Sequence, residues 1–411
     1  MRILVYSIFS PPEIIGIGKY NGDLIDWLSK KGYEIDLVTT FPFYPDWSVY
    51  KGYEGKIFSK ESVGNGINFY RSWCYVPKKV TGKKRLLHEI SFLISSTFNL
   101  IRLFTIKKYD KVLLIVPPFH LGFPIIVLKK FFHAKIIYHI QDLQVDAARE
   151  LKMIPNIVIR LSEKIEKIIL KKANLITTIS KGMIKKIQDK SISKEKIYLF
   201  PNWTDTRNIK PIDNQKLWLH KHLGLEEEKK LVVYSGNIGE KQGLEILIPV
   251  CKYYENIDDV HFVILGNGSY KEELIRIFKD KYISNVTFGN LVAKTDLNKM
   301  LNSSFTQLVI QKSVAEDSFL PSKLTNILSA GVPSVVTANP NTSLYHILEE
   351  NMCGIVVAPD SAQEIIKGIE GLLHDPVKRK KISKNSREYA LKSLSKDIIL
   401  TDFETNILKN K

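Results

Sequence analysis

Residues 321–333 read Pro-Ser-Lys-Leu-Thr-Asn-Ile-Leu-Ser-Ala-Gly-Val-Pro, and residues 334–336 continue with Ser-Val-Val. Pro and Ser favour the first positions of a helix, Leu and Ile recur at helical spacing, and Gly331 ends the pattern. The stretch therefore predicts a helix followed by a strand. The unpaired N–H groups at such a helix start, with Lys323 beside them, can bind an anion. Taken alone, the stretch is also consistent with an ordinary capped helix.

Short apolar runs alternate with helical patterns along the rest of the chain, which predicts an α/β fold with parallel strands. A turn-rich connection at residues 201–211 separates two halves, each expected to form a Rossmann-like, doubly wound parallel sheet. We expect one domain over residues 1–200, a second over 201–385, and an amphipathic helix within 386–411. The expected strands are Ile3–Ile8, Ile35–Thr39, Val112–Val116, Lys135–Ile140 and Leu175–Ile179, the last of the first half, then Lys230–Ser235, His261–Leu265, Val286–Gly289, Phe305–Ile310, Ser334–Thr337 and Gly354–Val357.

The composition is that of a folded protein with sizeable cores. The chain has 411 residues, of which 44% are hydrophobic and 10% aromatic. Cys74, Cys251 and Cys353 lie far apart and match no metal or disulfide spacing, so we expect a reducing compartment. A strand-like run begins at Arg2, which argues against a signal peptide. These features indicate a cytoplasmic protein.

Positive charge is concentrated in the first half of the chain. Residues 1–200 contain 33 Lys and Arg against 17 Asp and Glu, whereas residues 201–411 contain 27 against 26. A basic half suits an anionic surface, such as phospholipid, a pyrophosphate-linked lipid or nucleic acid. Neither a basic helix nor an aromatic-basic sheet face is evident, so no nucleic-acid partner is expected. A lysine-rich background composition is the alternative, but it does not explain the asymmetry.

The segment Leu86–Phe104 is strongly apolar and lies between the basic residues 83–85 and 107–108. A histidine, a glutamate and an arginine intrude near its ends, so we do not expect a full membrane span of about 20 apolar residues. An interfacial helix with basic flanks and a buried core helix both fit the pattern.

Two glycine-bearing loops each lie between an expected strand and an expected helix. The first includes Gly16, Gly18 and Lys19, where backbone N–H groups can approach a ligand. It departs from the dinucleotide fingerprint, because Gly22 comes one position late, and a tight turn is the alternative.

The second loop, residues 234–245, reads Tyr-Ser-Gly-Asn-Ile-Gly-Glu-Lys-Gln-Gly-Leu-Glu. Its glycines permit close backbone approach, and Lys241 can reach a phosphate oxygen at the helix start. A third turn with Gly266 and Gly268 follows a strand and either shapes a base pocket or is only a turn.

His139-Ile-Gln-Asp142 stands at the carboxyl end of the expected strand Lys135–Ile140, the edge where open α/β sheets bind ligands. A histidine and a carboxamide there can hydrogen-bond ligand hydroxyls, and Asp142 can orient His139 or accept from the substrate. The alternative is a histidine with only a packing role.

No Asp-x-Asp, His-Glu-x-x-His, cysteine-pair or Walker-type motif occurs in the sequence. We therefore expect no metal and no cofactor. If a diphosphate leaves during the reaction, lysines and helix N–H groups must stabilise its charge.

Together these motifs resemble the retaining glycosyltransferases of family 4, or group 1, which have the GT-B fold of two Rossmann-like domains facing across a cleft. The chain looks most similar to the bacterial branch for colanic acid, capsule and O-antigen polysaccharides, which includes fucosyl- and N-acetylfucosaminyltransferases. The resemblance covers essentially the whole chain. It rests on Pro-Pro-Glu-x-x-Gly-Ile-Gly-Lys-Tyr at 11–20, Phe-Tyr-Pro-Asp-Trp at 43–47, His-Ile-Gln-Asp at 139–142, Pro-Asn-Trp at 201–203, the loop at 234–245, and Leu-Pro-Ser-Lys-Leu-Thr-Asn-Ile-Leu at 320–328.

The resemblance implies transfer, with retention and without a required metal, of a sugar of the fucose or N-acetylfucosamine type. The donor implied is a nucleotide diphosphate sugar, with UDP favoured over GDP, held mainly by the second domain. The acceptor implied is a polyprenyl-diphosphate-linked saccharide, approached through the first domain at the inner face of the bacterial cell membrane. The last helix is implied to cross back onto the first domain. The expected catalytic residues are His139, Asp142 and Lys241, and the expected donor- and phosphate-binding residues are Gly16, Gly18, Lys19, Gly236, Asn237, Gly239, Gly266, Gly268, Ser322, Lys323, Leu324 and Asn326.

Two positions depart from the family pattern. Asn237 stands where many members have an arginine before the loop lysine. Many family members also have a pair of glutamates eight residues apart. Ser318 and Asn326 stand at those two positions here, with acidic residues at 316 and 317. Asn326 can hydrogen-bond a ribose hydroxyl but supplies no carboxylate, so phosphate and ribose contacts are expected to differ from the usual scheme. A nucleotide-sugar 2-epimerase of the same fold and a non-catalytic membrane scaffold are the alternatives.

Overall fold

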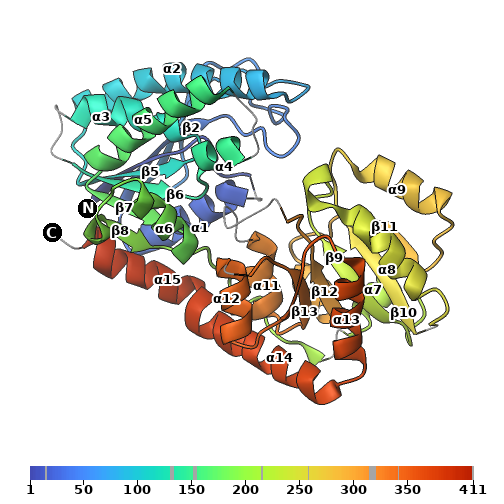
Figure 1. Cartoon of the computed structure of the whole chain (residues 1–411). Helices are drawn as coiled ribbons and strands as arrows, with labels where there is room; N and C mark the ends of the chain where they lie inside the picture. Colours follow the sequence, from blue (N-terminus) through green and yellow to red (C-terminus); the bar gives the residue numbers. More distant parts are fainter. Residues whose placement is uncertain are drawn as a thin grey trace. The chain divides into compact units, whose positions relative to one another are not determined.

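The computed structural model describes residues 1–13, 16–129, 134–150, 155–213, 216–257, 259–313, 321–340 and 342–409, without the side chains of Glu150 and Lys241. The chain divides into two compact units (Figure 1). Unit 1 comprises Met1–Pro201 and Asp402–Lys411, and unit 2 comprises Asn202–Thr401.

Unit 1 is built on an eight-stranded sheet in the order β3-β4-β2-β1-β5-β6-β7-β8. Its central strands are buried on both faces, as the β-branched run of β5 requires in a parallel sheet. The strands are β1 (Arg2–Tyr6), β2 (Glu34–Thr40), β3 (Phe58–Ser62), β4 (Ile67–Ser72), β5 (Lys111–Val116), β6 (Lys135–Ile140), β7 (Leu175–Thr178) and β8 (Ile197–Leu199).

Three features of this sheet differ from the sequence-based expectation, and the first is that β4 was not among the expected strands. β3 pairs antiparallel with β4, so the sheet is mixed rather than wholly parallel. β3 is an edge strand with alternating exposure, and its polar sequence carries no apolar run that predicts a strand. The strand at Leu175 is also not the last of its half, because the three-residue β8 pairs in parallel with β7.

The helices of unit 1 are α1 (Gly16–Lys30), α2 (Gly82–Ile106), α3 (Gly122–Leu128), α4 (Gln144–Glu150), α5 (Asn156–Lys172) and α6 (Lys181–Asp189). The crossovers that contain α2, α3 and α5 all move the chain in the same direction across the sheet, whereas α1 moves it the other way. Right-handed crossovers place these two sets on opposite faces. Figure 1 shows α2, α3 and α5 together on one side of the sheet and α1 on the other.

Unit 2 is built on a six-stranded parallel sheet in the order β11-β10-β9-β12-β13-β14. Its strands are β9 (Lys230–Ser235), β10 (Val260–Leu265), β11 (Val286–Gly289), β12 (Thr306–Val309), β13 (Ser334–Thr337) and β14 (Ile355–Val357). Helices cover both faces: α8 (Leu247–Tyr253), α9 (Lys271–Asp280) and α13 (Ala362–Leu373) pack in one cluster, and α7 (Trp218–Leu223), α10 (Leu297–Asn302), α11 (Ser322–Ser329) and α12 (Ser343–Glu350) in another.

The carboxyl-terminal segment is two helices, α14 (Pro376–Tyr389) and α15 (Lys396–Phe403), rather than the single helix expected over 386–411. Ser395 has an extended backbone and forms a parallel bridge with Thr204, which interrupts the helical pattern. The chain joins unit 1 only from Asp402 onward, where Phe403 stacks on Phe200 at a ring separation of 4.1 Å.

Candidate functional site

The strand order of unit 2 reverses between β9 and β12, and open α/β sheets bind ligands at the carboxyl ends of strands at such a point. The loop after β9 holds Gly236, Asn237 and Gly239. Helix α11, which begins with Ser322 and Lys323, connects β12 to β13. The fold therefore brings together at one edge of one sheet two segments that lie about 80 residues apart in the sequence.

Lys323 is the central residue of this edge. Its Nζ lies 3.6 Å from the centre of the Tyr234 ring. A Cβ built on Gly236 would lie 3.6 Å from the same Nζ atom. The Nζ atom is covered, and it has no hydrogen-bond partner among the described residues. Burial lowers the pKa of Lys323 to about 7. A cation over an aromatic face gains some stabilisation, but this does not replace the hydrogen bonds of an ammonium group.

The loop after β9 is fixed by main-chain hydrogen bonds to the turn after β10. Gly236 N donates to Leu265 O and Ile238 N to Asn267 O, both at 2.9 Å. A Cβ on Gly266 or Gly268 would lie 2.1 Å from a carbonyl oxygen of the 236–238 segment. These two glycines are thus brought to the site, and contact between the two loops accounts for them.

The turn at 237–242 is closed by a side chain. Gln242 Oε1 accepts from Gly239 N at 3.1 Å and from Asn237 Nδ2 at 3.3 Å, and Tyr234 Oη donates to Asn237 O at 2.7 Å. Lys241 lies in the 3₁₀ helix Glu240–Gln242, but its side chain is outside the described part of the structure.

The other predicted site residues of helix α11, Ser322, Leu324 and Asn326, lie in different environments. Ser322 is exposed at the first position, whereas Leu324 is buried in the core. Asn326 accepts a hydrogen bond from Thr204 Oγ1 at 2.6 Å, so its oxygen is engaged inside unit 2. Residues 316–318, the other part of the family's acidic pattern, lie outside the described residues.

Lys312 is a cation at this edge that the sequence analysis did not identify. It follows β12, and its Cε and Cγ atoms would lie 2.8 and 2.9 Å from a Cβ on Gly243, next to the turn that contains Lys241. Its position directly after a buried strand is the signal from which it could have been predicted.

In unit 1, the loop after β1 packs closely on itself. A Cβ on Gly18 would lie 2.9 Å from Glu13 Cβ, so this glycine is explained by a contact within the loop. Gly16 begins α1 with a positive φ of 60°. The Nζ of Lys19 lies 4.0 Å from Asp23 and 4.8 Å from the Tyr20 ring centre.

His139 has partners at both ring nitrogens. Nδ1 lies 2.9 Å from Thr177 Oγ1, and Nε2 lies 2.8 Å from Gln141 Nε2. Burial lowers the pKa of His139 to about 3, so the ring is neutral. Asp142 follows in the loop and is partly buried. The geometry gives His139 an orienting contact with Gln141, and the ring itself is 2% exposed.

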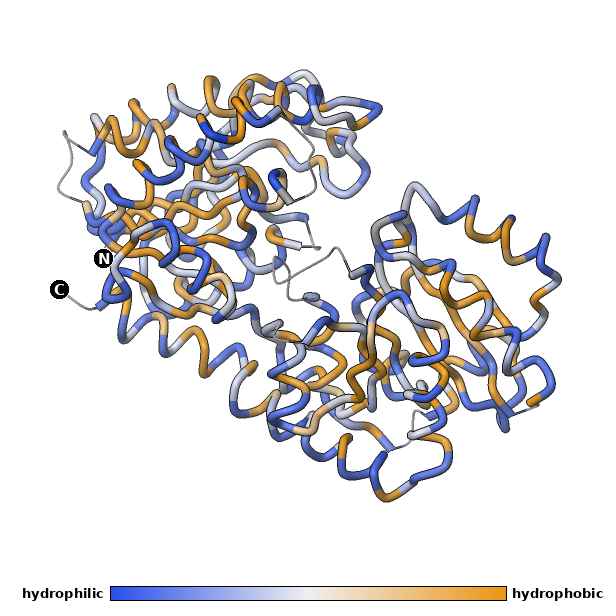
Figure 2. Tube along the Cα trace, viewed as in Figure 1, coloured by the Kyte–Doolittle hydropathy of each residue, from blue (hydrophilic) through white to orange (hydrophobic). Residues whose placement is uncertain are grey.

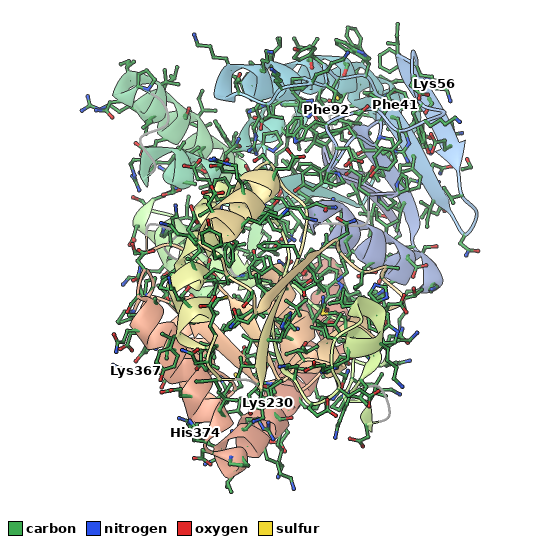
Figure 3. All side chains as sticks on the ribbon, turned by 90° about the vertical axis from the view of Figure 1, so that its right-hand side faces the viewer. Phe41, Lys56, Phe92, Lys230, Lys367 and His374 are labelled. Carbon is green, nitrogen blue, oxygen red and sulfur yellow. The ribbon has the colours of Figure 1, made fainter. Side chains whose placement is uncertain are left out.

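Helix α2 has one face in the core and another that is exposed. Its inner face is core: Phe92, labelled in Figure 3, is fully buried and its ring lies 5.8 Å from that of Tyr6 on β1. Its outer face is also apolar, with Ile94 60% and Phe98 65% exposed. The helix is long and apolar enough to cross a membrane by length and composition only, and 44% of its most apolar window is buried.

With this geometry established, comparison with known proteins gives consistent results. The sequence model of the family described as "Glycosyl transferases group 1" matches residues 217–389. WcaI of Escherichia coli (strain K12), whose name assigns it to colanic acid biosynthesis as a glycosyl transferase, is 34% identical over 414 residues, which cover 99% of this chain and 100% of WcaI. The chain belongs to the group 1 glycosyltransferases.

Solved structures of glycosyltransferases share the fold of this group 1 member. Sucrose-phosphate synthase from Thermosynechococcus elongatus matches with a TM-score of 0.77 at 16% identity, covering 99% of this chain and 98% of that one. Anabaena Alr3699/HepE, solved in complex with UDP and glucose, matches with a TM-score of 0.69 at 14% identity over the full length of both chains. The two sheets are those of the GT-B fold.

Proposed function

We propose that this glycosyltransferase moves a sugar from a nucleotide diphosphate sugar, bound by unit 2, to a polyprenyl-diphosphate-linked saccharide during synthesis of a bacterial surface polysaccharide. The name of WcaI supports the polysaccharide pathway, and the complex of Alr3699/HepE with UDP and glucose supports a UDP-sugar over a GDP-sugar. We further propose a donor sugar of the fucose or N-acetylfucosamine type, transfer with retention, and no requirement for a metal.

The observation that carries the proposal is the covered Nζ atom of Lys323 at the start of α11, which has no hydrogen-bond partner in the described part of the chain. A buried polar group without a partner costs free energy, and function is one reason for retaining it. A diphosphate at this position would supply the missing oxygen acceptors. The first N–H groups of α11, which have no partner within the helix, would contribute to the same anion site.

The proposed role of these cations follows from the reaction. Breaking the bond between the anomeric carbon and the diphosphate places negative charge on the leaving group, and groups already aimed at that charge lower the barrier. Lys323, Lys312 and Lys241 are the lysines of the segments that meet at this edge. His139 then acts by holding Gln141 and not by transferring a proton, because both ring nitrogens are occupied and a pKa lowered by burial to about 3 makes the ring a weak base.

A thermal-shift screen with UDP-, GDP- and TDP-sugars tests the donor site, because a ligand that binds the folded state raises the melting temperature. A UDP-sugar should raise it in the wild type, and Lys323→Met should abolish the rise. The exposed Lys279→Met is the matched control. If no nucleotide sugar stabilises the wild type, the proposal is wrong. Incubation with donor alone separates transfer from 2-epimerisation, since only an epimerase yields an isomeric donor.

We also propose that the outer face of unit 1 formed by α2, α3 and α5 docks on the anionic inner surface of the cell membrane. These helices share one side of the sheet, and Figure 2 shows apolar stretches along them. Their exposed apolar side chains are Leu86, Leu87, Ile90, Ile94, Phe98, Ile101 and Ile106 on α2, Phe123 and Val127 on α3, and Ile157, Val158, Leu161 and Ile168 on α5.

Charge complementarity selects phospholipid as the occupant of this face. Lys83, Lys84 and Arg102 are exposed on α2. On α5, a hollow of about 580 Å³ is lined by two apolar, three basic and one acidic residue: Ile157, Leu161, Arg160, Lys164, Lys167 and Glu163. Apolar side chains surrounded by Lys and Arg are typical of helices that lie in a membrane interface. Because the inner face of α2 belongs to the core, this helix would lie on the membrane rather than cross it.

A further inference from the structure

A second group of residues with unused hydrogen-bonding capacity lies in unit 1, around the loop 43–47. This loop follows β2, and the function proposed above gives it no role. The ring of His88, in the second turn of α2, lies 4.5 Å from the Phe43 ring and 5.3 Å from the Trp47 ring. His88 is 2% exposed, whereas Trp47 is partly exposed.

The tautomer of His88 follows from its contacts. Nδ1 lies 2.6 Å from the carbonyl oxygen of Tyr75, which can only accept, so Nδ1 carries the proton. Burial lowers the pKa of His88, so the ring is neutral. Nε2 is therefore a hydrogen-bond acceptor, and it has no partner among the described residues.

The loop above His88 is held in a strained conformation. Trp47 has φ of +50°, a left-handed backbone that a bulky residue rarely adopts. The carboxylate of Glu13, 2% exposed, anchors the loop by accepting from Phe43 N at 3.1 Å and Tyr44 N at 3.0 Å. Ser48 N donates to Phe43 O at 3.3 Å and closes the turn. The loop is thus fixed at its base, and Trp47 within it is partly exposed.

A second histidine, His120, also has a covered ring nitrogen, Nε2, without a hydrogen-bond partner among the described residues. The strand order of unit 1 reverses between β1 and β5, and His120 follows β5 at that point. Glu89, the residue after His88, acts on the pKa of both histidines, and its carboxylate is paired with Arg85 at 3.1 Å. The local charges therefore largely cancel.

These features restrict the kind of ligand. A neutral imidazole nitrogen with a free lone pair repels an anionic oxygen, so it does not suit a phosphate. The imidazole nitrogen attracts a hydroxyl donor, and a partly exposed indole ring packs well on the C–H face of a sugar. The described residues include no cluster of three or more His, Cys, Asp or Glu side chains that could hold a metal. A saccharide fits both the nitrogen and the ring.

We propose that His88 Nε2 and the Trp47 ring form a binding subsite for a sugar of the acceptor saccharide, with a sugar hydroxyl donating to Nε2 as Trp47 turns onto the sugar. The proposal rests on the proposed function, since it names residues that hold the acceptor. It also agrees with the membrane face, because the exposed apolar residues of α2 begin at Leu86, next to His88. A lipid-linked saccharide would then meet this subsite beside the docked surface.

The test uses the full chain and a panel of octyl glycosides of glucose, galactose, mannose, fucose and N-acetylglucosamine, below their micelle concentrations. Tryptophan fluorescence should change saturably with at least one glycoside, and Trp47→Phe should remove the change. His88→Asn keeps a donor for Tyr75 O but lacks an acceptor at Nε2, so it should weaken binding about tenfold or more. The longer side chain of His88→Gln can place an acceptor near the position of Nε2, so this variant should recover most of the affinity.

His374→Asn is the matched control, because His374 is an exposed residue after α13 in unit 2 (labelled in Figure 3). Three results would each overturn the proposal. They are an unchanged glycoside affinity in His88→Asn, no fluorescence change with any glycoside, and a fluorescence titration with octyl phosphate that matches the one with a glycoside. If His88→Asn does not fold, Trp47→Leu should weaken glycoside binding measured by calorimetry, and full affinity there would overturn it. The melting-temperature rise with UDP should be unchanged in all these variants, so failure of the donor site is recognised separately.

Discussion

The Nζ atom of Lys323 lies 3.6 Å from the centre of the Tyr234 ring, and no described residue accepts a hydrogen bond from it. The ring partly compensates the charge, and burial of the Tyr234 hydroxyl raises its pKa, so that it stays protonated and donates to Asn237 O. Among the described residues, the amine of Lys323 is thus free to pair with a bound anion.

Replacing Lys323 by Met should stabilise the free protein and remove its activity. A buried amine without a partner is unfavourable, whereas Met fills a similar volume, so the melting temperature should rise by about 2–4 °C. Sugar transfer should fall by about 100-fold or more, because a group that stabilises the leaving diphosphate is lost. Calorimetric unfolding and a transfer assay measure the two effects. Lys279→Met should leave both unchanged, and near-normal transfer in Lys323→Met would contradict the assignment.

Binding of UDP should take up protons at mildly alkaline pH. In the free protein burial lowers the pKa of Lys323 from 10.5 to about 7, so at about pH 8 most molecules contain the neutral amine. A bound diphosphate favours the ammonium form, so affinity should increase as the pH falls towards 7. Titration calorimetry in buffers with different ionisation enthalpies measures the uptake. Equal uptake in Lys323→Met would assign the proton to another group.

The same shift makes the stability of the free protein depend on pH. Between about pH 7 and 10.5 the unfolded chain binds more protons at Lys323 than the folded chain, so this group makes the free energy of unfolding rise with pH across that window. Denaturant unfolding of the wild type and of Lys323→Met at several pH values isolates the contribution as a difference. If the difference does not change with pH, the lowered pKa is wrong.

Replacing Glu13 by Ala should destabilise unit 1 by about 2–4 kcal/mol, because the backbone N–H groups of Ser10, Phe43 and Tyr44 lose their acceptor in a buried site. Urea unfolding followed by tryptophan fluorescence measures the change. Asp189→Ala, at an exposed position of the same unit, should change stability by less than about 0.5 kcal/mol. An equally small effect of Glu13→Ala would show that the loop does not depend on this anchor.

Charges on the outer face of α2 should prevent membrane binding. The double variant Ile94→Glu/Phe98→Glu should bind vesicles of phosphatidylglycerol and phosphatidylethanolamine at least about tenfold more weakly in sedimentation assays. Lys83→Gln and Lys84→Gln should each weaken vesicle binding about fivefold. High salt should also weaken it, because salt screens the attraction between lysines and anionic lipid. Val377→Glu is the control, since Val377 is 79% exposed in unit 2. Unchanged binding of the double variant would rule out this face.

The alternating fold was largely predictable from the sequence because buried parallel strands have continuous apolar runs. β6, β9, β11 and β13 have the predicted bounds, and α11 begins at Ser322 after Pro321 as the opening stretch indicates. β3, β4 and β8 were not predicted. β3 is a polar edge strand, β8 has only three residues, and the apolar residues of β4 are interrupted by Asn68 and Arg71. The break at Ser395 was also missed, since its cause is a bridge to Thr204, a residue far away in the sequence.

For the functional site, the sequence by itself determined which loops follow which strands, and hence that Gly236 and Lys323 belong to one sheet edge. Only the tertiary structure decided what each side chain contacts there. Asn326 is engaged by Thr204, 122 residues earlier in the chain, and Glu13 holds a loop 30 residues later. His139 has both nitrogens occupied, whereas Nε2 of His88 has no partner in the part of the chain that the structure describes. Spacing along a chain fixes the order of elements, but the partner of a buried polar atom depends on residues that meet only when the core packs.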